Sequence, residues 1–300
     1  MIVITGATGN TGKFAAETLL AKGENVRVIG RDAKRLDPFV RKGAEAFIGA
    51  AEDAASMTQA FKGAAAVYLI IPQAIHLGDF RAYQERISDA YAAAVAGAHI
   101  PYVVTLSSIG AHHAENTGPI VGLHNMEQKL NRIPGLNVLH LRPTYFMENF
   151  LMNISTIRSM NIFPGATPAD MPFQVIATKD IGIYAAHRLH ARDFSGSSAQ
   201  ELLGPRDVTM KEVASIIGKA IGKPGLQFVQ APFPMMEAAL IQMGLPKSSA
   251  ELMIELGKAG NSGLLAPQEA RSAKNTTPTT IEWFASEVFA PAYLGAAAKA

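Results

Sequence analysis

Short apolar runs alternate with longer amphipathic stretches through the first half of the chain. The short runs are rich in Val and Ile and apolar at nearly every position, as is typical of parallel strands covered by helices on both faces. We expect six such strands, at Ile2–Thr5, Val26–Gly30, Ala46–Ile48, Val67–Ile71, Tyr102–Leu106 and Val138–Leu141. Between them we expect helices at Gly12–Lys22, Met57–Lys62, Phe80–Ala96 and Val121–Asn131. The alternation predicts an α/β fold of the Rossmann type, with a doubly wound parallel sheet.

The alternation of short apolar runs with amphipathic stretches ends after Pro143. The residues that follow are rich in Pro, Met, Asn and Phe, and their hydrophobic positions show no clean period. A strand-like FQVIA at Phe173–Ala177 and a helix from Asp180 follow. Capping boxes predict three helix starts, at Ser56-x-x-Gln59, Thr209-x-x-Glu212 and Thr279-x-x-Glu282. We therefore expect a Rossmann domain over 1–143, to which 173–192 returns, and a smaller α+β substrate lobe built from 144–172 and 193–300.

Composition narrows the function classes. Of the 300 residues, 48% are apolar, and the formal net charge of +2 gives no reason to expect a nucleic-acid partner. The absence of cysteine excludes disulfides, thiolate nucleophiles and cysteine metal sites. No apolar run approaches the about 18 residues of a membrane span, and MIVIT is a strand pattern rather than a signal peptide. We expect a cytoplasmic protein with no membrane partner.

The opening stretch MIVITGATGNTGKF places Gly6, Gly9 and Gly12 between the first strand and the first helix. In this context the three glycines allow a sharp turn, a close backbone approach to a pyrophosphate, and tight helix–sheet packing. The helix then directs unpaired N–H groups at the phosphates. Short polar side chains on the same loop add hydrogen-bonding groups at Thr8, Asn10 and Thr11. The motif predicts a dinucleotide site.

The end of the second strand bears on which dinucleotide binds there. NAD-selective sites place an acidic residue at this point to hold the ribose 2′-hydroxyl. This chain instead has Gly30 followed by Arg31, and Arg31 can hold a 2′-phosphate through charge-assisted hydrogen bonds. Asp32 lies one residue further on and keeps NAD(H) possible. We predict a preference for NADP(H).

Three motifs carry a family resemblance: TGATGNTG at the first turn, LSSIGA at 106–111 and LRPTYFMENF at 141–150. Together they resemble the atypical short-chain dehydrogenase/reductase group, and within it the NmrA-like NAD(P)-binding proteins with their quinone-reductase and isoflavone-reductase-like relatives. The resemblance covers most of the chain. LRPTYFMENF is its most specific part.

The resemblance implies further cofactor contacts beyond the glycine turn. The end of the fourth strand would pass under the adenine ribose and the pyrophosphate, and two other segments would line the nicotinamide side. These implied contacts are Ile70, Ile71 and Pro72, then Leu106 and Ser107, then Pro143, Thr144, Tyr145 and Phe146.

Typical members of the superfamily use a Tyr-x-x-x-Lys pair on the helix after the fifth strand, where this chain reads GLHNMEQKL. By the same resemblance His124 occupies the approximate tyrosine position, and Gln128 follows one turn later on the same face. Lys129 is rotated about 100° from that face. His124 is therefore the candidate proton donor, with a plain hydrogen bond to the ribose or to a backbone carbonyl as the alternative.

Two functions stay open. The first is an NAD(P)H-dependent oxidoreductase that passes a hydride to quinones or similar small apolar carbonyl or azo acceptors. The second is a non-catalytic NmrA-like redox sensor that binds NAD(P) and a protein partner; an oligomer is also possible. Flexible and aromatic side chains would line an apolar pocket, at Tyr145, Phe146, Phe150, Phe163, Met147, Met152, Met235, Met236 and Met243. We predict no metal site, because no histidine cluster has the spacing for one.

Overall fold

A seven-stranded parallel sheet dominates the computed structural model, which describes residues 1–295. The strands follow the order β10-β6-β5-β4-β1-β2-β3, so the order reverses between β1 and β4. Their bounds are β1 Ile2–Ile4, β2 Val26–Gly30, β3 Glu45–Ile48, β4 Ala66–Leu69, β5 Tyr102–Leu106, β6 Asn137–Pro143 and β10 Ser197–Leu202. This arrangement confirms the predicted Rossmann-type doubly wound sheet.

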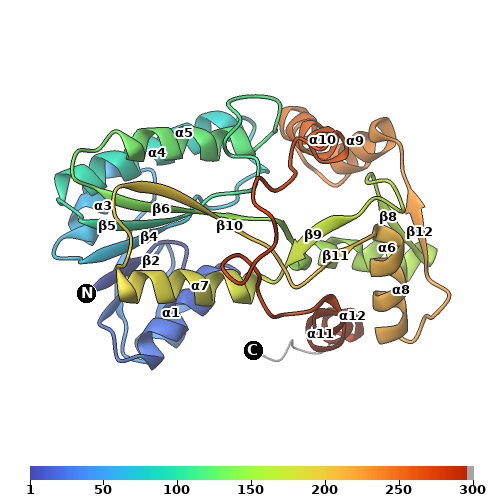
Figure 1. Cartoon of the computed structure of the whole chain (residues 1–300), viewed down its shortest axis with the longest axis horizontal. Coiled ribbons are helices and arrows are strands. Elements are labelled where there is room, and N and C mark those ends of the chain that lie inside the picture. The colour runs from blue at the N-terminus through green and yellow to red at the C-terminus, as the bar shows by residue number, and fades with distance from the viewer. Residues whose placement is uncertain (296–300) are drawn as a thin grey trace.

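Helices cover both faces of the large sheet (Figure 1), and each face buries its own apolar core. One face carries α1 Gly12–Ala21, α2 Ala33–Val40 and α7 Thr178–Ala191. The other carries α3 Ala54–Phe61, α4 Phe80–Gly97 and α5 Ile120–Asn131. Both faces of β1 and β4 are fully buried, which explains why their sequences are apolar throughout.

The six predicted strands all exist, and their boundaries agree to within two residues. The helix cap at Ser56 was wrong: α3 begins at Ala54, and the Asp53 carboxylate caps it by accepting the Ser56 N–H at 3.0 Å. Thr209 does cap its helix, through the Glu212 N–H. In the last capping box the cap is Thr280 rather than Thr279, because Thr279 donates its hydroxyl to Asp180 instead.

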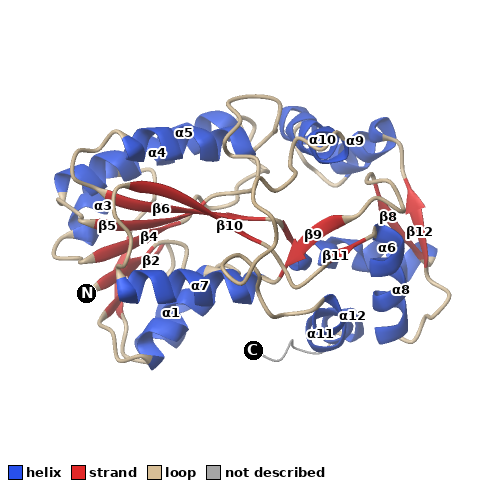
Figure 2. Ribbon diagram, viewed as in Figure 1, coloured by secondary structure: helices blue, strands red, loops and turns tan. Residues whose placement is uncertain are grey.

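The second part of the chain forms a lobe with two small sheets (Figure 2), and this lobe has its own core with several aromatic side chains. Its sheets have the orders β11-β9-β7 and β12-β8. The strands are β7 Tyr145–Phe146, β8 Ile162–Gly165, β9 Phe173–Ile176, β11 Asp207–Val208 and β12 Gln227–Gln230. The helical elements are η1 Met147–Asn153, α6 Ile154–Met160, α8 Met210–Ala220, α9 Phe233–Gln242, α10 Lys247–Asn261, α11 Ile281–Phe284, η2 Ala285–Phe289 and α12 Ala290–Leu294.

The chain crosses between the two parts several times after residue 143. Helix α7 returns to the large sheet, where Gly182 packs against the start of α1. Strand β10 also joins that sheet, beside β6, although it lies within the range 193–300. Strand β9, in contrast, belongs to the small sheet. Within residues 1–295, no helix has the length and apolar character needed to cross a membrane.

A segment that we call the crossing segment, residues 262–280, runs from α10 past the end of β10 to α11 (Figure 1). The buried Glu201 carboxylate of β10 accepts the N–H groups of Gln268 and Glu269, both at 3.0 Å. The Thr277 N–H donates to the Leu203 carbonyl at 2.8 Å. These bonds hold the second lobe against the carboxyl end of the large sheet.

Candidate functional site

The glycine turn follows β1 directly and lies at the point where the strand order reverses. Gly6 has a φ of +63°, a conformation that side chains disfavour, and its carbonyl accepts the Gly9 N–H at 2.9 Å. A Cβ on Gly12 would lie less than 3.0 Å from the Gly6 carbonyl oxygen and 2.8 Å from its carbonyl carbon. The first and third glycines are thus required by the turn itself, and Gly9 and Asn10 are exposed at its tip.

The N-terminus of α1 differs from those of the three helices that follow it. Asp32, Asp53 and Asp79 cap α2, α3 and α4 by accepting backbone N–H groups. Among the residues that the structure describes, no side chain caps α1, whose N-cap residue Thr11 is buried and whose first turn carries no acidic residue. The Lys13 N–H donates to the Gly9 carbonyl at 3.1 Å, so within residues 1–295 the N–H groups of Gly12 and Phe14 and the positive dipole end of α1 remain available to an anion, as a pyrophosphate site requires.

At the end of β2 the Arg31 side chain is exposed, whereas the carboxylate of the next residue, Asp32, caps a helix. Asp32 accepts the Lys34 N–H at 2.9 Å as the N-cap of α2. Arg31 is exposed and makes no ion pair with any residue in 1–295. Gly30 has a second role that the sequence did not suggest: a Cβ there would lie 3.1 Å from the buried Leu36 side chain, so the glycine also admits helix packing.

The end of β4 is hydrogen-bonded to β1 beside the glycine turn. The Thr5 hydroxyl donates to the Tyr68 carbonyl at 3.0 Å and accepts the Ile70 N–H at 2.8 Å. Ile70 packs its side chain beneath Gly6, with its Cβ 3.2 Å from the position a Gly6 Cβ would take. Ile71 is buried, and Pro72 is half-buried. The structure therefore places the predicted β4 contacts next to the turn.

The ends of β5 and β6 hold the residues implied for the nicotinamide side. Leu106 is half-buried, while Ser107, Pro143 and Thr144 are buried. The Ser107 N–H donates to the Leu141 carbonyl at 2.8 Å, which keeps the two strand ends side by side.

Sequence reasoning missed the side-chain network at these strand ends. Glu127 of α5 is 1% exposed, and it accepts the Ser107 hydroxyl at 2.5 Å. Arg142 of β6 binds both oxygens of the same carboxylate, at 3.0 and 2.5 Å. The sequence carried one signal for Glu127: it lies three residues after His124, and residues at this spacing share one face of a helix. Because the Ser107 proton is directed at Glu127, Ser107 offers a ligand only lone pairs.

His124 lies on α5, half-buried, with its Nδ1 2.8 Å from the Ala111 carbonyl oxygen. A carbonyl only accepts, so Nδ1 carries a proton and the neutral ring leaves Nε2 as an acceptor. The contact matches the alternative of a backbone-carbonyl bond. Donation from Nε2 requires the imidazolium form.

The neighbours of His124 do not complete a typical catalytic pair. Gln128 is exposed. Lys129 forms ion pairs with Glu85 at 2.5 Å and with Asp89 of α4, which turns it away from the strand ends, as the helical rotation predicted. Within residues 1–295, no group of three or more His, Asp or Glu side chains is arranged to hold a metal ion.

The apolar pocket candidates fall into three groups by exposure, of which one consists of the half-buried Phe146 and Met236. Met147, Phe150 and Phe163 are 0% exposed and belong to the core of the second lobe, so the expectation that they line a pocket was wrong. Tyr145 is 41% exposed; it packs on Phe150 with ring centroids 5.2 Å apart and against the edge of Phe173 at 5.8 Å. Its remaining ring surface is accessible. High exposure is shared by Met152, Met235 and Met243.

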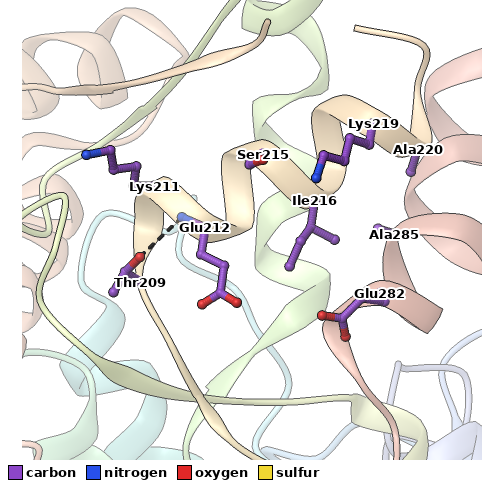
Figure 3. A pocket seen from close by; sticks show the side chains of 9 residues that line it. All are labelled: Thr209, Lys211, Glu212, Ser215, Ile216, Lys219, Ala220, Glu282 and Ala285. Atoms are coloured by element: carbon purple, nitrogen blue, oxygen red, sulfur yellow. Dashed lines mark hydrogen bonds between the residues drawn. The ribbon is translucent and has the colours of Figure 1, made fainter. Parts of the chain in front are cut away.

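A hollow of about 810 Å³ lies elsewhere, between α8 and the α11–η2 segment (Figure 3). Its lining combines apolar side chains with four charged ones, Lys211, Glu212, Lys219 and Glu282. None of the predicted cofactor residues lines it. The hollow is therefore separate from the candidate site at the sheet.

The reversed strand order, the glycine turn and the uncapped helix at one edge define a Rossmann-type α/β protein, a class in which dinucleotides bind at this edge of the sheet. The NmrA-like family matches residues 1–285. The chain belongs to the NmrA-like family, a part of the atypical short-chain dehydrogenase/reductase group, as its motifs suggested.

Two curated relatives are similar over most of their length. A (4-alkanoyl-5-oxo-2,5-dihydrofuran-3-yl)methyl phosphate reductase from Streptomyces griseus is 28% identical over 267 residues, which are 89% of each chain. Quinone oxidoreductase 2 of Escherichia coli is 27% identical over 288 residues, 93% of this chain and 95% of that one. The crystal structure of the NADPH-dependent quinone oxidoreductase QOR2 of Escherichia coli with NADPH superposes with a TM-score of 0.81 at 22% identity, covering 96% of this chain and 100% of that one.

Proposed function

We propose that this protein is an NAD(P)H-dependent reductase that transfers a hydride to quinones or similar small apolar carbonyl or azo acceptors. The observation that carries the proposal is the glycine turn with its uncapped helix at the point of strand reversal. The two curated relatives are named as reductases, and the similar crystal structure holds NADPH, which supports the same chemistry here.

The residues present fit the cofactor. The turn around Gly6, Gly9 and Gly12, with Thr8, Asn10 and Thr11, would hold the pyrophosphate against α1. Ile70, Ile71 and Pro72 would lie under the adenine ribose, and Leu106, Ser107 and 143–146 would line the nicotinamide. When bound, the cofactor supplies the hydride, and the protein aligns the acceptor with it.

NADP(H) is the preferred cofactor in this proposal, because Arg31 makes no ion pair within residues 1–295 and one carboxylate oxygen of Asp32 caps α2. A guanidinium at this place can bind a 2′-phosphate through two N–H groups. An aspartate whose oxygen already accepts a backbone N–H is less able to hold a ribose 2′-hydroxyl, so NADH should bind more weakly.

The acceptor and its proton have candidate partners in this chain. The exposed ring of Tyr145, in β7 two residues after β6 ends, offers an apolar surface near the strand ends. His124 in its imidazolium form can donate a proton from Nε2 to a reduced quinone oxygen. Ser107 is a poor donor to that oxygen, because Glu127 already accepts its proton.

The second candidate, a non-catalytic redox sensor, is favoured by the lack of a tyrosine on α5 and by the engagement of Lys129 with α4. One experiment separates the two. Purified protein is mixed with NADPH and with each quinone of a panel in turn, and the absorbance of the reduced nicotinamide is followed over time. The reductase proposal predicts consumption that scales with enzyme concentration; tight NADPH binding without consumption for any acceptor would favour the sensor.

A further inference from the structure

The buried ion pair between Glu127 and Arg142 joins the elements that would surround the nicotinamide. Arg142 binds both carboxylate oxygens of Glu127, a planar two-bond geometry that fixes direction as well as distance. The Glu127 side chain is 1% exposed, and that of Arg142 is 13% exposed. Ser107 completes the unit by donating to Glu127 at 2.5 Å. We call these three residues the strand-end triad.

Each member of the strand-end triad is next to a residue of the candidate site. Glu127 lies one helical turn after His124 on α5. Arg142 immediately precedes Pro143, and its β6 neighbour Leu141 accepts the Ser107 N–H at 2.8 Å. The triad therefore fixes α5, β5 and β6 relative to one another at the edge where the nicotinamide would lie. The glycine turn is held separately, by its own backbone and by Thr5.

A buried ion pair is weak evidence of a stabilising role, because apolar side chains of similar volume often stabilise a fold as well or better. Its geometric precision is what an apolar pair would lack. The Glu127 carboxylate also orients the Ser107 hydroxyl. Because an ionised carboxylate can only accept hydrogen bonds, the Ser107 proton must point toward Glu127. The arrangement thus suits the placement of other groups.

We propose that Glu127 and Arg142 are positioning residues for the nicotinamide half of the cofactor site. They act through Ser107, which they hold as a hydrogen-bond acceptor for a donor group of the ligand, and through the β6 end that carries 143–146. This inference rests on the proposed function only in taking a nicotinamide nucleotide as the ligand. It does not depend on turnover.

The test compares two ligands by calorimetry or fluorescence. NADPH reaches both halves of the site, whereas adenosine 2′,5′-bisphosphate carries only the adenine half. In Glu127→Gln we expect NADPH to bind about 10-fold more weakly, the equivalent of one lost charge-assisted hydrogen bond, and adenosine 2′,5′-bisphosphate to change less than about twofold. The matched control is Glu85→Gln on α4, which breaks a partly exposed pair with Lys129 of α5, the helix that carries Glu127, and should leave both affinities unchanged.

A purely structural role would weaken both ligands together or neither, and either result would overturn the inference. Arg142→Lys keeps the charge but loses the two-bond geometry, and it replaces Glu127→Gln in the same comparison if that variant does not fold. The inference fails if wild-type protein binds neither ligand. If wild type binds NADPH but consumes it with no acceptor, the reductase proposal fails while the selective loss of NADPH affinity still supports the triad.

Discussion

Replacing Arg31 by alanine tests cofactor choice at a single side chain. Arg31 is exposed at the end of β2 and pairs with no carboxylate in 1–295, so its removal breaks no ion pair of the protein. Hydrogen bonds to a charged group contribute about 1.5–3 kcal/mol each. Since about 1.4 kcal/mol corresponds to a factor of ten, NADPH should bind about 10- to 150-fold more weakly. Exposure and salt screening favour the lower end of this range.

The assay is calorimetric titration of wild type and Arg31→Ala with NADPH and with NADH. Affinity for NADH should change less than about twofold, because that cofactor has no 2′-phosphate. Arg41→Ala is the matched control for net charge: Arg41 is also exposed, follows α2, and should leave NADPH affinity unchanged. Equal losses for the two cofactors in Arg31→Ala would refute the assignment of Arg31 to the 2′-phosphate.

Three further predictions concern the turn, the proton donor and acid stability. Gly12→Ala should cost about 1–3 kcal/mol of unfolding free energy and weaken NADPH binding, because the added Cβ meets the Gly6 carbonyl; Gly225→Ala, with open space around it, should do neither in urea unfolding and titration. If His124 donates the proton, His124→Ala should lower turnover while NADPH affinity stays unchanged in titration; unchanged turnover would exclude the role. Burial lowers the pKa of His140 from 6.5 to about 4, so the unfolded chain binds this proton at a higher pH than the folded chain does. The free energy of unfolding therefore decreases as pH falls from about 6.5 to about 4, and the loss reaches about 3 kcal/mol at pH 4. Urea unfolding at pH 7 and pH 4 should show a smaller acid loss in His140→Gln, and an equal loss would contradict the reasoning.

The sheet was predictable from sequence because buried parallel strands carry an unbroken apolar pattern. Val26–Gly30 and Tyr102–Leu106 have the predicted bounds, and Gly23 has the positive φ expected just after a helix. Helix α2 escaped prediction because Pro38 lies inside it and its exposed face is highly charged. Helix α10 was also missed.

Contacts between distant segments explain why parts of the site were not foreseen. The burial of Glu127 depends on Arg142 of β6 and on Ser107, which directly follows β5, and a helical pattern alone does not reveal these partners. Phe150 and Phe163 resemble pocket residues in sequence, yet they pack against each other inside the second lobe, with ring centroids 5.8 Å apart. The strand β10 joins the large sheet only because Glu201 and its neighbours pair with β6 across about 60 residues of intervening chain.

The central claim is that the glycine turn binds a nicotinamide dinucleotide, and calorimetric titration of the intact protein with NADPH tests it most directly. We expect saturable binding at one site per chain, weakened in Gly12→Ala and preserved in Gly225→Ala. The absence of heat and of any fluorescence change with both NADPH and NADH would contradict the claim, and with it both the reductase and the sensor.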